Sequence, residues 1–294
     1  MYEINNLTFR YMLSDRNSLE QVSLKIKKGK ITLIAGPSGS GKTTLLRHLK
    51  KELLPKGKRS GKVLYDGQKI EQLEGLRSVK EVGYLFQNPS AQMVMDTVWH
   101  EIAFGLENLG MPYEQMKRTV AEIINYFDLQ KIYHEDTDKL SGGQKQLVNL
   151  AAVMAMHPKV LILDEPTAGL DPAGRDEILD LIARMHKEKG ITVILVSHSM
   201  EDVAKYVERI IVMNHGQVMF DNTPCEVFKH YKELEQIGLA APQVTYLMHE
   251  LKEKGLNVNT EATTVAEARE SLLEVLLGRE PNHRGSNLEE ENLC

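Results

Sequence analysis

The octapeptide GPSGSGKT, residues 36–43, constrains the fold more than any other stretch of this sequence. It fits the pattern G-x-x-x-x-G-K-[ST] and lies between a strand-like apolar run, ITLIAG, and a helix-like run, TTLLRHLK. Glycines allow successive backbone N–H groups to turn inward around an anion, and the following helix adds the positive end of its dipole. The sequence therefore predicts a strand, a phosphate-binding loop and a helix in succession.

Two side chains at the end of this loop carry the chemistry that a bound phosphate needs. Lys42 supplies a mobile positive charge to the outer phosphates, and Thr43 offers a hydroxyl to Mg²⁺. A chance glycine-rich turn is the competing interpretation, but it would not require the flanking strand and helix. The predicted phosphate-binding residues are Gly36, Pro37, Ser38, Gly39, Ser40, Gly41, Lys42, Thr43 and Thr44.

The apolar runs predict an α/β fold built on a parallel sheet. ITLIAG, VLILDE and ITVILVSH are nearly continuous in aliphatic residues, which is typical of strands buried on both faces beneath helices. The alternation in YEINNLTF and in VMNHGQVMF, with a turn at residues 214–216, favours antiparallel strands. We therefore expect an N-terminal antiparallel β subdomain beside a parallel-sheet core.

Polar residues end two of these apolar runs and follow a third, shorter run. Asp164 and Glu165 end VLILDE, His198 ends ITVILVSH, and Gln87 follows the short run YLF. Carboxyl ends of parallel strands face the crevice where open α/β sheets bind ligands. We predict that Asp164 contacts Mg²⁺ through water, that Glu165 orients or deprotonates an attacking water, and that His198 reaches the γ-phosphate. Helix capping is the alternative for the two carboxylates, and an ordinary strand end is the alternative for His198.

Three segments are expected along the chain. Residues 1–228 form one large domain, in which residues 91–157 are an inserted helical subdomain. Residues 229–280 read as a small helical appendage, with Pro242 at one helix start and Thr263 or Thr264 as a cap. Residues 281–294 are polar and acidic and are expected to be disordered.

Charge and hydropathy narrow the functional classes. The formal net charge of -5 gives no general support to nucleic-acid binding, which is usually basic. No signal-peptide-like or membrane-spanning apolar run is visible, so a membrane role is expected to depend on partners.

The stretch LSGGQ, Leu140–Gln144, is a second glycine-rich segment that contains no acid, base or metal ligand. Together with GPSGSGKT, FQNP, LILDEP, AGLD and SH, in this order, it makes residues 1–228 resemble the ABC-type ATPases. The resemblance implies ATP and Mg²⁺ as ligands. It also implies that LSGGQ faces the γ-phosphate held by a second subunit, so that two ATP molecules lie between two chains.

The resemblance assigns roles to the matching positions. Tyr11 matches the aromatic that stacks on adenine, although a partly buried strand aromatic is the alternative. Gln87 matches the glutamine that links Mg²⁺ and water to the transporter, and Asp171 matches the aspartate that communicates across the dimer. Glu165 and His198 match the catalytic glutamate and switch histidine. The signature residues that complete the partner's site are Ser141, Gly142, Gly143 and Gln144.

Residues 87–111 are similar to the corresponding segment of energy-coupling factor (ECF) transporter ATPases, in particular the second of their two paired types. This implies an importer of vitamins or transition-metal ions at the cytoplasmic face of the membrane. The implied partners are a second ATPase (a paralogue or a copy of this chain), a transmembrane coupling protein and a substrate-binding membrane protein. Met93, Val94, Met95 and Trp99 are expected either to receive the coupling protein or to pack inside the helical subdomain.

Two other classes compete with this interpretation. Another ABC importer, for example for sugars, commonly has a longer β-rich regulatory domain. A soluble ABC protein of translation or DNA repair commonly has two ATPase units or long insertions, and neither is visible here. Leu147 departs from the family pattern, which commonly has arginine at this position after the signature.

Overall fold

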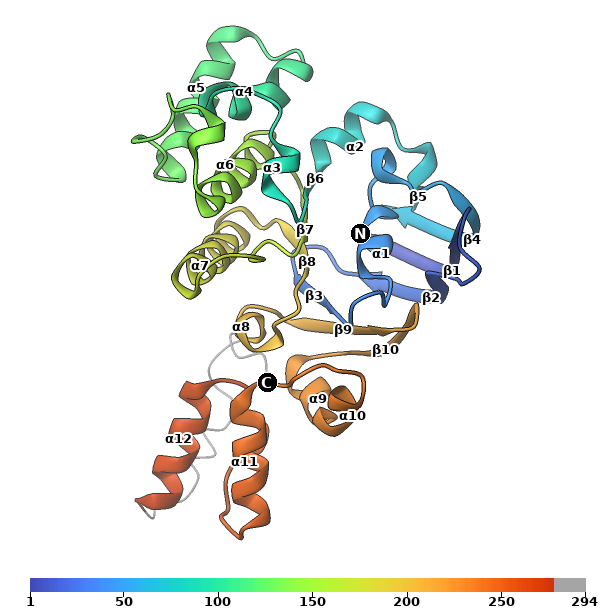
Figure 1. Ribbon diagram of the computed structural model, residues 1–294, viewed down its shortest axis with the longest axis vertical. Helices are drawn as coiled ribbons and strands as arrows, with labels where there is room; N and C mark the ends of the chain where they lie inside the picture. Colours follow the sequence, from blue (N-terminus) through green and yellow to red (C-terminus); the bar gives the residue numbers. More distant parts are fainter. Residues whose placement is uncertain (278–294) are drawn as a thin grey trace.

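The computed structural model describes residues 1–277 (Figure 1). The tail 281–294 and the end of the predicted appendage lie outside the described residues. Two sheets organise the chain, and helices surround one of them. The strands are β1 (Tyr2–Tyr11), β2 (Leu19–Ile26), β3 (Ile31–Ala35), β4 (Gly57–Tyr65), β5 (Gln68–Lys69), β6 (Val82–Leu85), β7 (Val160–Asp164), β8 (Thr192–Val196), β9 (Arg209–Asn214) and β10 (Gln217–Asn222).

The helices fall between and after these strands. The α-helices are α1 (Lys42–Arg47), α2 (Gly75–Glu81), α3 (Pro89–Gln92), α4 (Val98–Asn108), α5 (Tyr113–Tyr126), α6 (Gly142–Ala155), α7 (Pro172–Lys189), α8 (Met200–Ala204), α9 (Pro224–Phe228), α10 (Tyr231–Gln236), α11 (Gln243–Glu253) and α12 (Val265–Leu276). Within residues 1–277, no helix is long and apolar enough to cross a bilayer.

The core sheet has the order β10-β9-β3-β8-β7-β6. Its five strands from β9 to β6 pair in parallel, and β10 pairs antiparallel to β9. The second sheet, β2-β1-β4-β5, is antiparallel throughout. The predicted α/β class and the antiparallel N-terminal subdomain are confirmed. The hairpin at residues 214–216 is also present, but β9 belongs to the parallel set as well.

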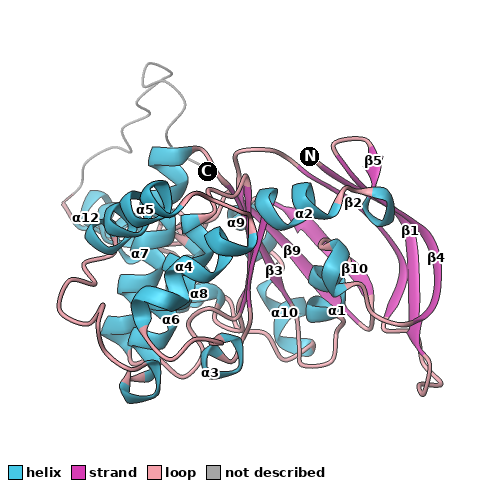
Figure 2. Ribbon diagram, turned by 90° about the horizontal axis from the view of Figure 1, so that it is seen from above, coloured by secondary structure: helices cyan, strands magenta, loops and turns pink. Residues whose placement is uncertain are grey.

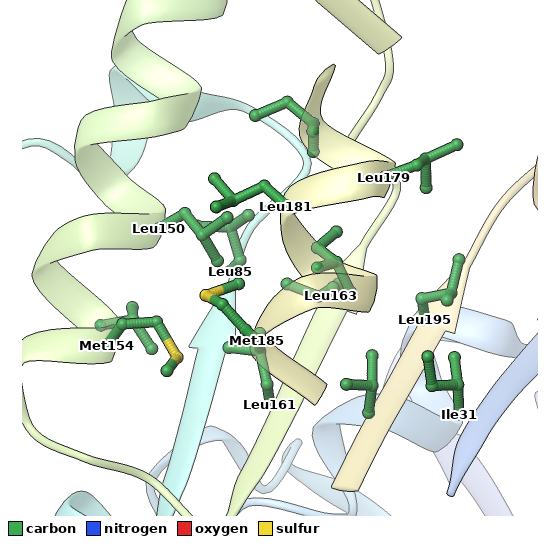
Figure 3. Close-up of a cluster of buried hydrophobic side chains, with 14 of the residues drawn as sticks. Ile31, Leu85, Leu150, Met154, Leu161, Leu163, Leu179, Leu181, Met185 and Leu195 are labelled. Carbon is green, nitrogen blue, oxygen red and sulfur yellow. The ribbon is translucent and has the colours of Figure 1, made fainter. Parts of the chain in front are cut away.

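The continuous apolar strands are explained by burial on both faces of the core sheet. On one face, side chains of β6, β7 and β8 pack against α6 and α7, as Figure 3 shows for Leu85, Leu163 and Leu195 with Leu150, Leu181 and Met185. On the other face, Ile34, Ile162 and Ile194 pack with side chains of the antiparallel sheet and α1. Figure 2 shows this layering, with α4 to α7 on one side of the core sheet and β1, β2 and β4 on the other. Each fully buried aliphatic side chain contributes about 1.5–3 kcal/mol.

The C-terminal helices divide between two clusters. Val227, Phe228 and Leu234, from α9 and α10, belong to the main core. Helices α11 and α12 instead enclose a small cluster around Met248 and lie beside one another at one end of the molecule (Figure 1). Thr264 caps α12 in a reciprocal capping box with Glu267, as its sequence position predicted.

Candidate active site

The phosphate-binding loop connects β3 to α1 at the carboxyl edge of the core sheet. Gly39 and Gly41 have positive φ angles, 77° and 102°. A Cβ atom at Gly41 would lie 2.3 Å from the Ser18 carbonyl oxygen, so a side chain cannot be accommodated there without moving the backbone. The loop therefore requires glycine both for its conformation and for its close approach to the end of the first hairpin.

Lys42 is buried and lies over its own loop. Its Nζ donates hydrogen bonds to the carbonyl oxygens of Gly36 at 2.7 Å and Pro37 at 2.9 Å. Burial lowers the pKa of Lys42, while the carboxylates of Glu165 and Asp164 oppose that shift. The ammonium group is thus held at the centre of the loop by weak neutral acceptors, which a phosphate oxygen can replace.

Glu165, His198 and Gln87 meet at the same edge. They follow β7, β8 and β6, and since those strands are parallel neighbours their ends come together. His198 Nε2 lies 2.7 Å from Glu165 Oε1, and Gln87 Nε2 donates to Glu165 Oε2 at 2.7 Å. Both oxygens of this carboxylate are therefore bound by neighbouring strand ends.

Glu165 is also held by its backbone. Its φ of 53° lies in the left-handed region, which costs a non-glycine residue roughly 1–2 kcal/mol, and its N–H donates to Val196 O. The cavity in front of it measures about 340 Å³. Its lining combines this cluster with the phosphate loop: Ser18, Ser38, Gly39, Gly41, Lys42, Thr43, Thr44, Gln87, Glu165 and His198.

Asp164 is buried at the end of β7, behind Thr43. Thr43 Oγ1 donates to Asp164 Oδ1 at 3.2 Å, and the Tyr84 hydroxyl donates to Oδ2 at 3.2 Å. Burial raises the pKa of Asp164, while these two hydrogen bonds oppose the shift. Burial, together with the Asp164 charge, also raises the pKa of Tyr84, so its hydroxyl remains a donor.

The donor set at this point fits Mg²⁺. A hydroxyl oxygen and a carboxylate oxygen face one another, and hard cations prefer such ligands. Among residues 1–277, no group of three or more His, Cys, Asp or Glu side chains could hold a metal without further ligands. Mg²⁺ at nucleotide sites is commonly bound by one or two protein oxygens, and phosphates and water supply its other ligands.

Tyr11 lies at the end of β1, beside the start of α1. Its hydroxyl is 3.2 Å from Thr44 Oγ1, and its ring meets Phe9 edge to face with centroids 4.9 Å apart. It does not line the 340 Å³ cavity. Both its predicted contact with adenine and the alternative of a strand aromatic remain open.

The signature segment lies outside that cavity. Ser141 caps α6 in a capping box: Ser141 Oγ accepts from Gln144 N, and Gln144 Oε1 accepts from Ser141 N. Ser141 and Gly142 head the helix, and none of residues 141–144 is among the cavity's lining residues. Asp171 likewise has a local partner, because its Oδ1 accepts from Gly174 N at 3.0 Å as the cap of α7.

Leu147 packs on the main core between α6 and α7. It lines another cavity, of about 290 Å³, together with the apolar Phe127 and Leu181 and the charged Asp128, Glu177, Asp180 and Arg184. The side chain therefore fits the helix interface as an apolar residue.

Three residues around the site were not identified from the sequence. Tyr84 was read only as part of an apolar strand. Gln92 accepts from Phe86 N at 2.9 Å and so closes the turn that carries Gln87. The buried carboxylate of Glu101 accepts from Val94 N and Met95 N and shapes the segment after that turn. The repeated glutamine in QNPSAQ was a usable signal for Gln92, whereas the other two required the strand and helix placement.

Comparison with known sequences identifies the family. Residues 19–168 match the family model described as ABC transporter. The chain is 47% identical, over 86% of its length, to a putative ABC transporter ATP-binding protein of Bacillus cereus, but covers only 46% of that relative. The chain thus spans about half the length of the first curated relatives it matches. It is 44% identical to the energy-coupling factor transporter ATP-binding protein EcfA2 of Clostridium tetani, over 95% of this chain and 99% of that protein.

Solved structures give the same picture. The structure of cbiO1 from Clostridium perfringens, described as part of the ABC transporter complex cbiONQ, is 33% identical with a TM-score of 0.71. The match covers 84% of this chain and 98% of that one. The dimeric ATP-binding cassette MJ0796, bound to ADP and Pi after hydrolysis, is 28% identical with a TM-score of 0.66, covering 76% of this chain and 98% of that one.

Proposed function

This chain belongs to the ABC transporter family of ATP-binding proteins, and on that premise we propose that it is the ATP-hydrolysing subunit of an ECF-type importer. The importer takes up a micronutrient, a vitamin or a transition-metal ion. The chain converts ATP binding and hydrolysis into closing and opening of a two-ATPase unit at the cytoplasmic face of the membrane. The match to EcfA2 over 95% of this chain and 99% of that protein, and to cbiO1 over 84% of this chain and 98% of that one, supports this class over other ABC importers.

One observation carries the proposal. Glu165 is held between Gln87 and His198 at 2.7 Å on each side, facing the loop that contains Lys42 across a single cavity. Such an arrangement suits transfer of a phosphoryl group to water, in which positioning and charge neutralisation supply most of the catalysis.

The reaction uses these groups as follows. A water oxygen forms a bond to the γ-phosphorus while the bond to the β–γ bridging oxygen breaks, which yields ADP and inorganic phosphate. Glu165 orients that water and takes its proton, His198 contacts the γ-phosphate, and Lys42 neutralises charge on the outer phosphates. Thr43, Asp164 and Gln87 would hold Mg²⁺, which when bound neutralises charge on the β- and γ-phosphates.

The working site is shared between two chains. Ser141 and the following glycines stand at the N-terminus of the 14-residue helix α6, outside their own chain's cavity. We assign them to the γ-phosphate in the partner's site, with Asp171 at the contact between subunits. The dimeric state of the MJ0796 cassette supports this assignment. The partner is a paralogous ATPase or a second copy of this chain.

The membrane partners are a coupling protein and a substrate-binding protein. The segment Met93–Met95 with Trp99 is the assigned contact for the coupling protein. Val94 is 64% exposed there, and Glu101 fixes the backbone on either side of it. In this proposal residues 1–228 are the ATPase domain and residues 229–280 the appendage, in which α10 packs on the main core through Leu234 while α11 and α12 have their own small core.

Co-purification from detergent-extracted membranes tests this function. A tagged chain is expected to bring with it a second ATPase and membrane proteins, and the complex is expected to hydrolyse ATP. Lys42→Ala is the matched control, because it should keep the partners and lose nucleotide-dependent activity. Isolation with ribosomes or DNA, and never with membrane proteins, would refute the transporter assignment.

A further inference from the structure

Tyr84 contacts the carboxylate that the proposed site assigns to the metal ion. Its hydroxyl donates to Asp164 Oδ2 at 3.2 Å, while Thr43 donates to the other oxygen, Oδ1, at 3.2 Å. The two oxygens of Asp164 therefore have different neighbours: Oδ1 faces the phosphate loop and Oδ2 faces the interior of the sheet.

The position of Tyr84 is fixed on several sides. It lies in β6, which pairs in parallel with β7, and Tyr84 stands opposite Ile162, two residues before Asp164. Its ring packs on Phe86, with centroids 4.8 Å apart, and is 95% buried. Its carbonyl oxygen accepts from Gln92 Nε2 at 3.4 Å. A side chain held in this way can orient the group that it binds.

We propose that Tyr84 is a positioning residue for the divalent cation that accompanies ATP: its hydroxyl holds Asp164 Oδ2, so that Oδ1 faces Thr43 and the cation. This inference rests on the proposed function. Tyr84 does not touch the nucleotide cavity and acts only through Asp164. Its hydroxyl is not required for the phosphate loop to bind an anion.

Loss of the hydroxyl has a specific physical consequence. Without it, the Asp164 carboxylate keeps the Thr43 hydrogen bond at Oδ1 but loses the one that holds Oδ2, and Oδ2 is left in a buried place without that donor. Outer hydrogen-bond partners of metal ligands typically account for about 10- to 100-fold in metal affinity. Affinity for nucleotide without metal depends on the loop amides and Lys42, which the change does not reach.

The test is the affinity of the full chain for a non-hydrolysable ATP analogue, measured in Mg²⁺ and again in EDTA. In Tyr84→Phe, the Mg²⁺-dependent gain in affinity should fall about 10-fold, while the affinity in EDTA stays within about 2-fold of wild type. Mn²⁺ bound with the same analogue, followed by electron paramagnetic resonance, should dissociate more readily by a similar factor. Tyr84→Met, which also lacks the hydroxyl, should behave alike and serves if the Phe variant does not fold.

Tyr65→Phe is the matched control. The Tyr65 hydroxyl, in the antiparallel sheet, also donates to a carboxylate, Glu81 Oε2 at 2.9 Å, but Glu81 precedes the start of β6, whereas the site residue Gln87 follows the other end of that strand. This variant should leave the Mg²⁺-dependent gain unchanged. In an Asp164→Asn background, Tyr84→Phe should have no further effect on that gain.

Two outcomes would overturn the inference. One is an unchanged Mg²⁺-dependent gain in Tyr84→Phe, and the other is an equal loss in Mg²⁺ and EDTA, which would indicate a general structural role. Failure of the proposed function looks different, because the chain would then be isolated with ribosomes or DNA and not with membrane proteins, whatever its affinity for the analogue in Mg²⁺ or EDTA.

Discussion

The two glycine-rich segments of this chain are built in opposite ways. Helix α1 is largely buried behind the phosphate loop, with Lys42 bonded to its own loop and Glu165 facing it across one cavity. The signature segment heads α6 at an exposed helix start, where the side chains of Ser141 and Gln144 bind each other's backbone in a capping box. Both can bind an anion through backbone N–H groups, but only the first is surrounded by side chains that can carry out chemistry.

This difference indicates that the phosphate loop belongs to the catalytic site, whereas the signature segment contributes a binding surface. A catalytic group must be held in place before the reaction, and the phosphate side meets that need within one chain. A helix start that is capped and solvent-exposed is complete as a structure and still open to a ligand. It therefore fits the proposed role of a surface that meets the other subunit's phosphate when two ATPase subunits close together.

The largest expected effect is on the phosphate side. Glu165→Gln should lower ATP turnover by at least about 10²–10³-fold, because it removes the base at the attacking water while keeping the contacts of Gln87 and His198 in reach. ATP binding should persist, and closed dimers should accumulate in size-exclusion chromatography with ATP. Near-normal turnover would show that Glu165 does not activate the attacking water. The phosphate loop would then differ from the signature segment in no catalytic side chain at this position.

Acid should lower the stability of the fold through a residue on the phosphate side. His48 follows α1, is fully buried, and has its pKa lowered to about 4 by burial. Since the unfolded chain binds the proton near pH 6.5, stability is fully present above that pH and is lost as pH falls towards 4. The loss by pH 4 is about 3 kcal/mol. Denaturant unfolding of wild type and His48→Met across this pH range should show that the free energy of unfolding falls more steeply with decreasing pH in wild type. The same pH dependence in both proteins would show that His48 does not cause the loss.

A smaller effect is expected at the signature segment. Ser141→Ala should lower turnover about 10-fold, because one donor to the partner-held phosphate is lost, while the chain's own nucleotide affinity is retained. Thr264→Ala is the control, since Thr264 heads the same kind of capping box on α12. Both variants should lose about 1 kcal/mol of stability. In a heterodimer, loss confined to the site with this chain's own Lys42 would refute the assignment across the interface.

The smallest effect is expected just beyond the signature. Leu147→Arg should change stability by less than about 1 kcal/mol and turnover by less than about 3-fold, because the 290 Å³ cavity has room and offers Glu177 and Asp180 as partners for a guanidinium group. Thermal unfolding and steady-state hydrolysis measure both quantities. A large gain in turnover would mean that Leu147 limits the activity of the signature segment. The function of that segment would then depend on packing along α6 as well as on its capping box.

Much of the site could be predicted because local sequence determines it. The loop GPSGSGKT, the strand ends at Glu165 and His198 and the cap at Thr264 each depend on residues within a few positions of one another. Tyr84 and Glu101 could not be found in this way. Tyr84 meets Asp164 only because β6 lies beside β7, and Glu101 reaches Val94 only because α4 turns back on the preceding segment. Apolar periodicity signals burial but does not reveal which polar atom a buried side chain reaches.

The sequence alone determined that this chain is an α/β nucleotide-binding protein of the ABC type, because its motifs are short and their backbone requirements are local. Only the tertiary structure decided which of them share a site. Parallel strand order brings Gln87, Glu165 and His198 to one edge beside the phosphate loop, and the same packing leaves Ser141 outside that cavity. The reason is physical: side chains distant in sequence become neighbours only when buried strands and helices fix their relative positions.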